Sequence, residues 1–251
     1  MEEEKKIERK FSNPILVILT LFATAIQMPF LFWPTGTLSW LEGWIYLVIF
    51  FISFSLIFIV LNHKNPEILI NRMKMKKESI RKKKEKVTDD NKIIVKASGT
   101  DKIILPLFGI FFLAVFVIPA FDRRFNWSTI WIWSEIIGFA LLPLSFYIIY
   151  RVMLENAYAS KVLDIRADSG QKLIDTGPYA IVRHPMYSGF ALMVISIALG
   201  LGSWYALFPA ILAIIFLGIR IKYEEAMLME GLEGYKEYKK KVKFKLIPKI
   251  Y

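Results

Sequence analysis

The sequence has no cysteine and only two histidines, His63 and His184, among 251 residues. Without cysteine, disulfides, thiolate nucleophiles and thiolate metal sites are excluded. Two histidines are too few for a metal centre built from histidine alone. A mixed site with carboxylates remains open, but we expect no metal.

Hydrophobic residues, by contrast, make up 55% of the chain and lie in long uninterrupted runs. Runs of about 20 apolar residues are long enough to cross a bilayer. The pattern predicts an all-α, multi-pass transmembrane helical bundle of six spans, at residues 14–33, 40–61, 102–121, 129–150, 186–201 and 203–223. The fifth run is short for a full crossing, so the last two spans form either a tilted pair or a shallow helical hairpin.

The net charge of +11 comes from basic residues that flank these spans. This placement favours contact with anionic membrane lipids over nucleic acid, so we expect no nucleic-acid partner. The connection at residues 62–102 holds 13 lysines and arginines, whereas the connections after the first and third spans hold none and two. The positive-inside rule therefore predicts cytoplasmic N- and C-termini.

We expect one structural domain with two regions. Residues 1–154 form a membrane bundle of four spans with a basic cytoplasmic loop at 62–102, and residues 155–251 carry the polar motifs. The oligomeric state is not predicted.

The last two spans join two polar clusters. The first cluster includes Arg183 and His184 at the start of the fifth span, where Pro185 suits the first helical turn. Unpaired N–H groups and the helix dipole favour an anion there, and Arg183 strengthens that preference. The turn at Gly200–Ser203 is so tight that the spans must run antiparallel, which returns the second cluster to the same face.

The second cluster consists of Arg220, Glu224 and Glu225 at the end of the sixth span. Arg220 and Glu224 are four residues apart and can pair along the helix. An end that favours anions beside an end that carries carboxylates suits a zwitterion, such as the amino-acid moiety of S-adenosylmethionine.

Four stretches together resemble the isoprenylcysteine carboxyl methyltransferase family of membrane enzymes, whose broader relatives include phospholipid N-methyltransferases. They are GPYAIVRHPMYSGF (177–190), LGLGSW (199–204), RIKYEEAML (220–228) and GYKEYKKKVKFKLIP (234–248). The resemblance is strongest over residues 155–248.

This resemblance implies an S-adenosylmethionine site in the cytoplasmic C-terminal region, and the chain indeed has no G-x-G-x-x-G fingerprint. The implied cofactor-binding residues are Ile174, Gly177, Tyr179, Val182, His184, Pro185, Tyr187 and Glu225. Arg220 and Glu224 correspond to the catalytic positions nearest to methyl transfer and the acceptor.

The acceptor is expected to be lipophilic, with a prenylcysteine-type carboxylate as the first candidate and a phospholipid amine or another isoprenoid as alternatives. A carboxylate acceptor needs no base, since it is ionised near neutral pH. An amine would need Glu224 or His184 to remove a proton. The rival interpretations are a membrane reductase that uses a nicotinamide cofactor and a small transporter that relays ions through Arg220, Glu224 and Glu135. The C-terminal segment from Gly231 is expected to lie on the membrane surface, either as a lid over the site or as an anchor.

Overall fold

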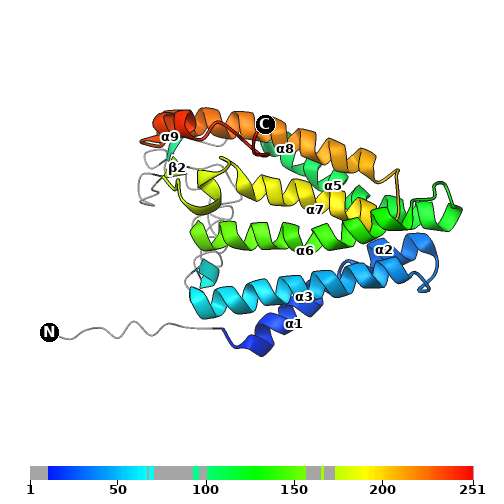
Figure 1. Ribbon diagram of the computed structural model, residues 1–251. Coiled ribbons are helices and arrows are strands. Elements are labelled where there is room, and N and C mark those ends of the chain that lie inside the picture. Colours follow the sequence, from blue (N-terminus) through cyan, green and yellow to red (C-terminus); the bar gives the residue numbers. More distant parts are fainter. Residues whose placement is uncertain are drawn as a thin grey trace.

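The computed structural model describes residues 11–66, 68–70, 93–95, 101–156, 165–166 and 173–250. Helices lie side by side along most of this chain, with the polar segments gathered at one end of the bundle (Figure 1). The elements are α1 (Asn13–Ala25), α2 (Met28–Thr35), α3 (Leu41–Lys64), β1 (Ile93–Val95), α5 (Asp101–Phe125), α6 (Ile132–Glu155), β2 (Ile165–Arg166), η3 (Gly177–Ala180), α7 (Pro185–Gly200), α8 (Leu207–Gly231) and α9 (Tyr235–Lys241).

The predicted multi-pass helical fold is confirmed. Four helical stretches are long and apolar enough to cross a membrane, at Asn13–Thr35, Leu41–Lys64, Lys102–Phe125 and Ile132–Glu155. Only the short antiparallel pair of β1 and β2 departs from helix among the described elements. The protein is therefore an integral membrane protein by the length and composition of its helices.

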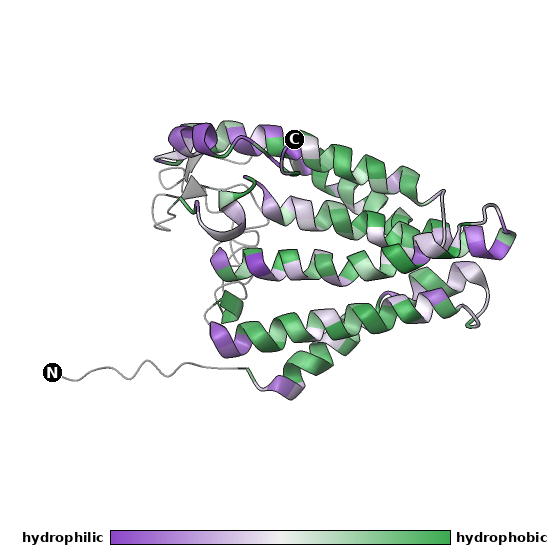
Figure 2. Cartoon of the chain, in the orientation of Figure 1, coloured by the Kyte–Doolittle hydropathy of each residue, from purple (hydrophilic) through white to green (hydrophobic). Residues whose placement is uncertain are grey.

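The expected fifth and sixth spans form a shorter hairpin. Helix α7 has 16 residues and extends over only ~24 Å, which is less than a ~30 Å hydrocarbon core. Helix α8 has 25 residues, but its second half carries Arg220, Lys222, Glu224 and Glu225. The hairpin thus places the polar half of α8 beside the start of α7 (Figures 1 and 2).

The first predicted span, residues 14–33, is present as the candidate span Asn13–Thr35, but it consists of two helices, α1 and α2. Helix α1 ends at Ala25 and α2 begins at Met28, with Ile26 and Gln27 in a turn between them. Pro29 lies in the first turn of α2 and has no N–H to donate to the preceding turn. The Gln27 amide compensates in part, because its Nε2 donates to the Ala23 carbonyl at 3.0 Å.

The basic loop at 62–102 is shorter than predicted where the structure describes it. Helix α3 continues to Lys64, and α5 begins at Asp101. Asn62 is buried, accepts from the Phe11 N–H at 3.0 Å and donates to the Phe11 carbonyl at 2.7 Å, so it fastens the N-terminal segment to α3. Most of the remaining loop lies outside the described residues.

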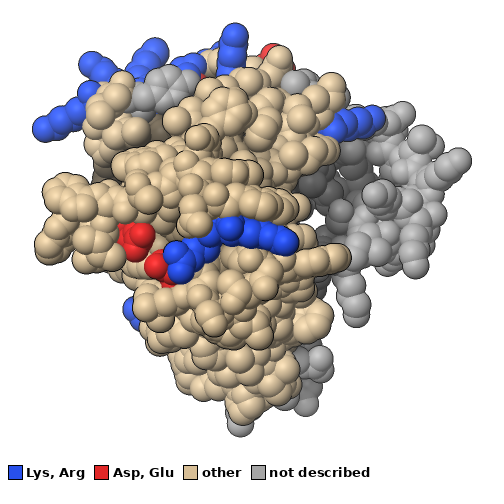
Figure 3. Space-filling model, turned by 90° about the vertical axis from the view of Figure 1, so that its right-hand side faces the viewer, with Lys and Arg blue, Asp and Glu red and all other residues tan. Residues whose placement is uncertain are grey.

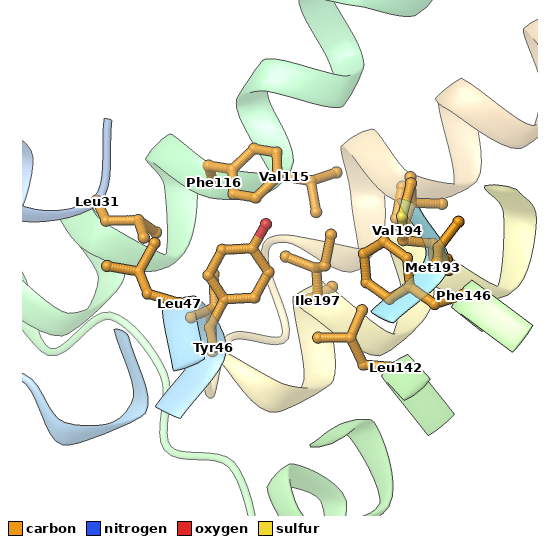
Figure 4. Packing of buried hydrophobic residues seen from close by; sticks show 14 of the residues in the cluster. Leu31, Tyr46, Leu47, Val115, Phe116, Leu142, Phe146, Met193, Val194 and Ile197 are labelled. Carbon is orange, nitrogen blue, oxygen red and sulfur yellow. The ribbon is translucent and has the colours of Figure 1, made fainter. Parts of the chain in front are cut away.

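The apolar core runs through the middle of the bundle, where α3, α5, α6 and α7 meet. Tyr46, Val115, Leu142, Val194 and Ile197 are all at most 2% exposed and point toward one another (Figure 4). Small residues let α6 and α7 approach closely, since an added Cβ at Gly138 would come within 2.8 Å of Leu199 Cβ and the Ser196 carbonyl oxygen.

The two ends of the bundle differ in charge. At the end that holds the α7–α8 turn, the described charged residues are Glu42, Asp122, Arg123, Arg124 and Glu135. Most of the surface seen from that end is uncharged (Figure 3). The opposite end carries α9 and its lysines and is the more hydrophilic one (Figure 2).

Gly138→Ala is expected to destabilise the protein by about 1–3 kcal/mol, because the added methyl overpacks against α7 backbone that cannot move aside. The measurement is the midpoint of thermal unfolding in detergent. Gly218→Ala is the matched control, since a Cβ at Gly218 meets nothing within 4 Å. Equal midpoints for the two variants would contradict the close approach of α6 and α7.

Candidate active site

The site is built around the N-terminus of α7. His184 is the residue before the first helical position, and Pro185 opens the helix as the sequence predicted. Residues 242–246, here called the C-terminal strap, cross this helix start. The Arg183 N–H donates to the Phe244 carbonyl and the His184 N–H to the Lys245 carbonyl, both at 2.9 Å. The Ser188 hydroxyl fixes the strap further along by donating to the Leu246 carbonyl at 2.6 Å.

A buried ion pair joins α7, α8 and the strap. Arg183 Nε donates to Glu225 Oε1 at 2.6 Å, and both side chains are at most 5% exposed. Arg183 Nη1 donates to the carbonyls of Val242 and Lys243, each at 2.7 Å. His184 Nε2 lies 3.3 Å from the same Glu225 oxygen, and Lys239 Nζ lies 3.5 Å from Oε2.

This arrangement corrects one prediction. The sequence suggested that free N–H groups and Arg183 would bind an anion at the start of α7. Instead, the N–H groups of Arg183 and His184 are bonded to the strap, and the guanidinium of Arg183 is bonded to Glu225 and two carbonyls. Arg183 therefore holds the site together through its Nε and Nη1 atoms, which bond to Glu225 and to the strap.

Next to this pair, Tyr187 links the two expected catalytic residues. Its hydroxyl donates to Glu224 Oε2 at 2.7 Å and accepts from Arg220 Nη1 at 2.8 Å. The Arg220 guanidinium lies 5.6 Å from the centre of the Tyr187 ring. The rings of His184 and Tyr187 are stacked at 5.8 Å with an angle of 16°. Contacts thus connect His184, Tyr187, Arg220, Glu224 and Glu225 into one continuous group.

The remaining predicted cofactor residues lie at varying distance from this group. Val182 and Pro185 are buried beside Arg183 and His184. Tyr179 in η3 accepts at its hydroxyl from Asn156 Nδ2 at 3.0 Å, and its carbonyl accepts from the Tyr238 hydroxyl at 2.8 Å.

The last two predicted cofactor residues are Gly177, at the start of η3, and Ile174, in the segment before it. Gly177 has a φ of +56° and packs against the Glu155 carboxylate at the end of α6, where a Cβ would come within 2.7 Å. Ile174 is half-buried in the segment before η3.

The sequence did not mark Tyr235 as a site residue, yet the structure brings it close to Glu225. Tyr235 is 3% exposed, and its hydroxyl has no hydrogen-bond partner among the described residues. Burial first, and then the negative charge of Glu225, raise the pKa of Tyr235, so the hydroxyl stays a proton donor. Tyr235 is the first residue of α9, in a lysine-rich segment that gave no local signal of this role.

The charge of Glu225 is fixed by its partners. Burial alone would raise its pKa, but hydrogen bonds from His184 and Arg183 and the charge of Arg183 outweigh burial and lower the pKa to about 2. Glu225 is therefore a carboxylate throughout the neutral range.

The start of α7 and the carboxylate-bearing end of α8 both lie in the part of the chain that matches a known protein family. Residues 133–234 match the family model described as phospholipid methyltransferase. The match begins in α6, takes in η3, α7 and α8, and therefore covers every residue that the resemblance assigned to the site. It indicates a membrane methyltransferase, which is the broader part of the resemblance drawn from the sequence. No curated protein matches the chain.

Arg183→Gln is expected to destabilise the protein by about 3–5 kcal/mol, because it removes one partner of a buried ion pair. It also removes the donor that holds the strap carbonyls, so cleavage by trypsin after Lys243 or Lys245 should accelerate. Lys241→Gln is the control: Lys241 is 69% exposed and lies 3.4 Å from Asp175. Such an exposed pair contributes at most ~1 kcal/mol, so similar losses in both variants would contradict the central role of Arg183.

The pH dependence of protein stability should reveal the lowered pKa of Glu225. Its pKa is lower in the folded protein than in the unfolded chain, so its contribution is complete above pH 4.5 and is lost as the pH falls toward 2. We expect a loss of about 1–3 kcal/mol over this window from Glu225. Thermal unfolding in detergent between pH 6 and pH 2 measures it. Glu225→Gln should show a shallower acid dependence, whereas Glu237→Gln on the exposed side of α9 should keep that of the wild type.

Proposed function

We propose that the protein is a membrane methyltransferase that uses S-adenosylmethionine to methylate a lipophilic acceptor. A prenylcysteine-type carboxylate is the first candidate acceptor. The observation that carries the proposal is the position of the Tyr187–Arg220–Glu224 group, which lies beside the buried Glu225 and inside the residues that match the phospholipid methyltransferase family.

The buried polar groups at the end of α8 fit a zwitterionic cofactor. The Tyr235 hydroxyl is buried without a partner in the described part of the chain, and such a group needs an acceptor to offset its desolvation. Glu225 offers a carboxylate whose second oxygen lies 3.5 Å from Lys239 Nζ. We assign the cofactor to Tyr179, Val182, His184, Pro185, Tyr187, Glu225 and Tyr235, with Ile174 and Gly177 at the approach.

S-adenosylmethionine would supply an electrophilic methyl group on a sulfonium. The protein then has to position the two reactants, which is the main requirement of an in-line displacement. Arg220 is a fixed cation, held by the Tyr187 hydroxyl at 2.8 Å, that can orient an acceptor carboxylate. No base is required for this acceptor, because it is ionised near neutral pH.

A phospholipid amine is the second candidate, because the matching family model is described as phospholipid methyltransferase. An amine loses a proton on methylation, and Glu224 is placed to receive it. Glu224 already accepts from Tyr187 at 2.7 Å, so this acceptor would have to share or displace that hydrogen bond.

The geometry counts against the transporter. Glu135 lies in the first turn of α6 beside Gly202, at the end of the bundle that holds the α7–α8 turn. Arg220 and Glu224 lie at the other end of α8, so the three residues do not form a relay.

The lysine-rich end carries the site and is assigned to the cytoplasmic side. Its described lysines include Lys236, Lys239, Lys240, Lys241 and Lys243 around α9, against Arg123 and Arg124 at the opposite end. By the positive-inside rule this asymmetry supports cytoplasmic termini and contact with anionic lipids.

Tyr235→Phe tests the cofactor assignment. It removes a hydroxyl without a described partner, so it should leave the thermal midpoint unchanged while weakening S-adenosylmethionine binding by about 5–10-fold, the value of one hydrogen bond. Titration calorimetry in detergent measures the binding. Tyr238→Phe is the matched control, because it loses the 2.8 Å hydrogen bond to the Tyr179 carbonyl and should lower the midpoint instead. Absence of saturable binding by the wild type would refute the proposed function.

Transfer of labelled methyl from S-adenosylmethionine identifies the acceptor. The substrates are N-acetyl-S-farnesylcysteine and phosphatidylethanolamine, each supplied to the full-length protein in vesicles. Label on the first and not on the second supports the carboxylate acceptor, and the reverse supports the amine.

A further inference from the structure

A cavity of about 280 Å³ lies inside the membrane-spanning part of the bundle, away from the polar site. It is bounded by the break between α1 and α2 and by α3, α5 and α7, and its walls include Gln27, Tyr46, Leu113, Met193 and Ile197. Its volume is just below the ~300 Å³ at which small-molecule sites begin. Figure 4 shows the Tyr46 ring and hydroxyl directed toward the space between α5 and α7.

The broken first span is one wall of this cavity. Irregular backbone at membrane depth is tolerated where it is buried in protein or lines a cavity, and broken helices mark substrate sites in several membrane proteins. The polar groups at the break satisfy one another: Gln27 Nε2 donates to the Ala23 carbonyl at 3.0 Å, and the Tyr46 hydroxyl donates to Gln27 Oε1. These polar side chains in the cavity wall are thus bonded within the protein, so the cavity suits a hydrocarbon chain.

The cavity opens toward the lipid. Phe30 and Leu113 at its rim are 39% and 40% exposed, whereas Tyr46, Met193 and Ile197 inside it are at most 6% exposed. The medium outside the rim is lipid hydrocarbon, and an apolar cavity of this kind does not hold water. A hydrocarbon chain can thus enter from the lipid-facing side, past Phe30 of α2 and Leu113 of α5.

Helix α7 connects the cavity with the polar site. Met193 and Ile197 come six and ten residues after Tyr187, which corresponds to ~9 Å and ~15 Å along the helix. Half of a ~30 Å hydrocarbon core is the same depth, so a lipid with its reactive group at Tyr187 brings its chain end to this level. Met186, Phe190, Met193 and Ile197 share one face of α7 at helical spacing, which makes this face apolar from the site to the cavity.

We propose that the cavity holds the distal part of the hydrocarbon chain of the methyl acceptor and selects acceptors by chain length. This inference rests on the function proposed above. It assigns to Phe30, Tyr46, Leu113, Met193 and Ile197 a role in binding the acceptor, at a distance from the residues that touch its reactive group.

Two substitutions that fill the cavity test the inference. Met193→Trp places a bulkier side chain in the interior, and Leu113→Trp narrows the rim at a position that is 40% exposed and tolerates the change. Leu144→Trp on α6 is the matched control, since Leu144 is 47% exposed and lies away from the cavity. KM is measured for a long-chain and a short-chain form of the acceptor that the wild type methylates. For a prenylcysteine acceptor, these are N-acetylcysteine with a farnesyl group and N-acetylcysteine with a single isoprene unit. For a phospholipid acceptor, they are dioleoyl and dihexanoyl phosphatidylethanolamine.

Both filling variants should raise KM for the long-chain form at least tenfold, because apolar pockets discriminate chain segments by about this factor. KM for the short-chain form and the dissociation constant of S-adenosylmethionine should stay within twofold of the wild type, and Leu144→Trp should change neither. If Met193→Trp fails to fold, Leu113→Trp alone decides. Equal effects on both chain lengths, or no effect on either, would overturn the chain site while leaving the proposed function intact.

Photolabelling supplies a readout that does not need turnover. A farnesylcysteine with a diazirine on its last isoprene unit, added to the wild type in phosphatidylcholine vesicles, should label peptides of α5 and α7 around Leu113 and Met193. Excess unlabelled farnesylcysteine should remove this label, and so should Met193→Trp. Absence of label at these peptides overturns the inference, as does label that unlabelled farnesylcysteine does not displace, which would indicate a site filled by bulk lipid.

Discussion

The buried pair between Arg183 and Glu225 is the interaction on which the site depends. It ties the start of α7, the polar half of α8 and the C-terminal strap to one point, with Nε–Oε1 at 2.6 Å and two strap carbonyls at 2.7 Å. A buried ion pair contributes little net stability beyond what an apolar contact would provide, but it fixes geometry, because no alternative packing satisfies both charges. The polar end of the hairpin is thereby held in one arrangement, and burial beneath the strap keeps water from competing for the pair.

The two adjacent carboxylates of α8 consequently have separate tasks. Successive residues of a helix point about 100° apart, so Glu225 turns inward to Arg183 and His184 while Glu224 turns to the Tyr187 hydroxyl. Glu225 is 4% exposed and neutralised by its partners, whereas Glu224 is half-buried. The pair of residues thus combines a buried structural anchor, Glu225, with a more exposed carboxylate, Glu224, that contacts Tyr187.

Much of the fold follows from the sequence, because spans read from hydrophobic runs depend on composition alone. The helices α3, α5, α6 and α7 begin and end within a few residues of the predictions. The break at Ile26–Gln27 was missed, since Pro29 and Pro34 sit in a run that is apolar throughout and periodicity does not show where a helix is interrupted. Likewise, the motif pointed to the group formed by His184, Tyr187, Arg220, Glu224 and Glu225. It could not show that the Arg183 side chain bonds to the strap, because that contact joins residues about 60 positions apart.

The same tertiary contact changes how the site must be interpreted. A free helix N-terminus attracts an anion through unpaired N–H groups, yet those of Arg183 and His184 are already bonded to the strap. In the proposed function, charge recognition therefore falls to Arg220 for an anionic group and to Glu224 for a cationic one, and both of these side chains contact the Tyr187 hydroxyl. If the acceptor is a lipid that enters from the bilayer, as proposed, the apolar face of α7 would set how deeply its chain inserts and therefore the position of its reactive group beside Arg220.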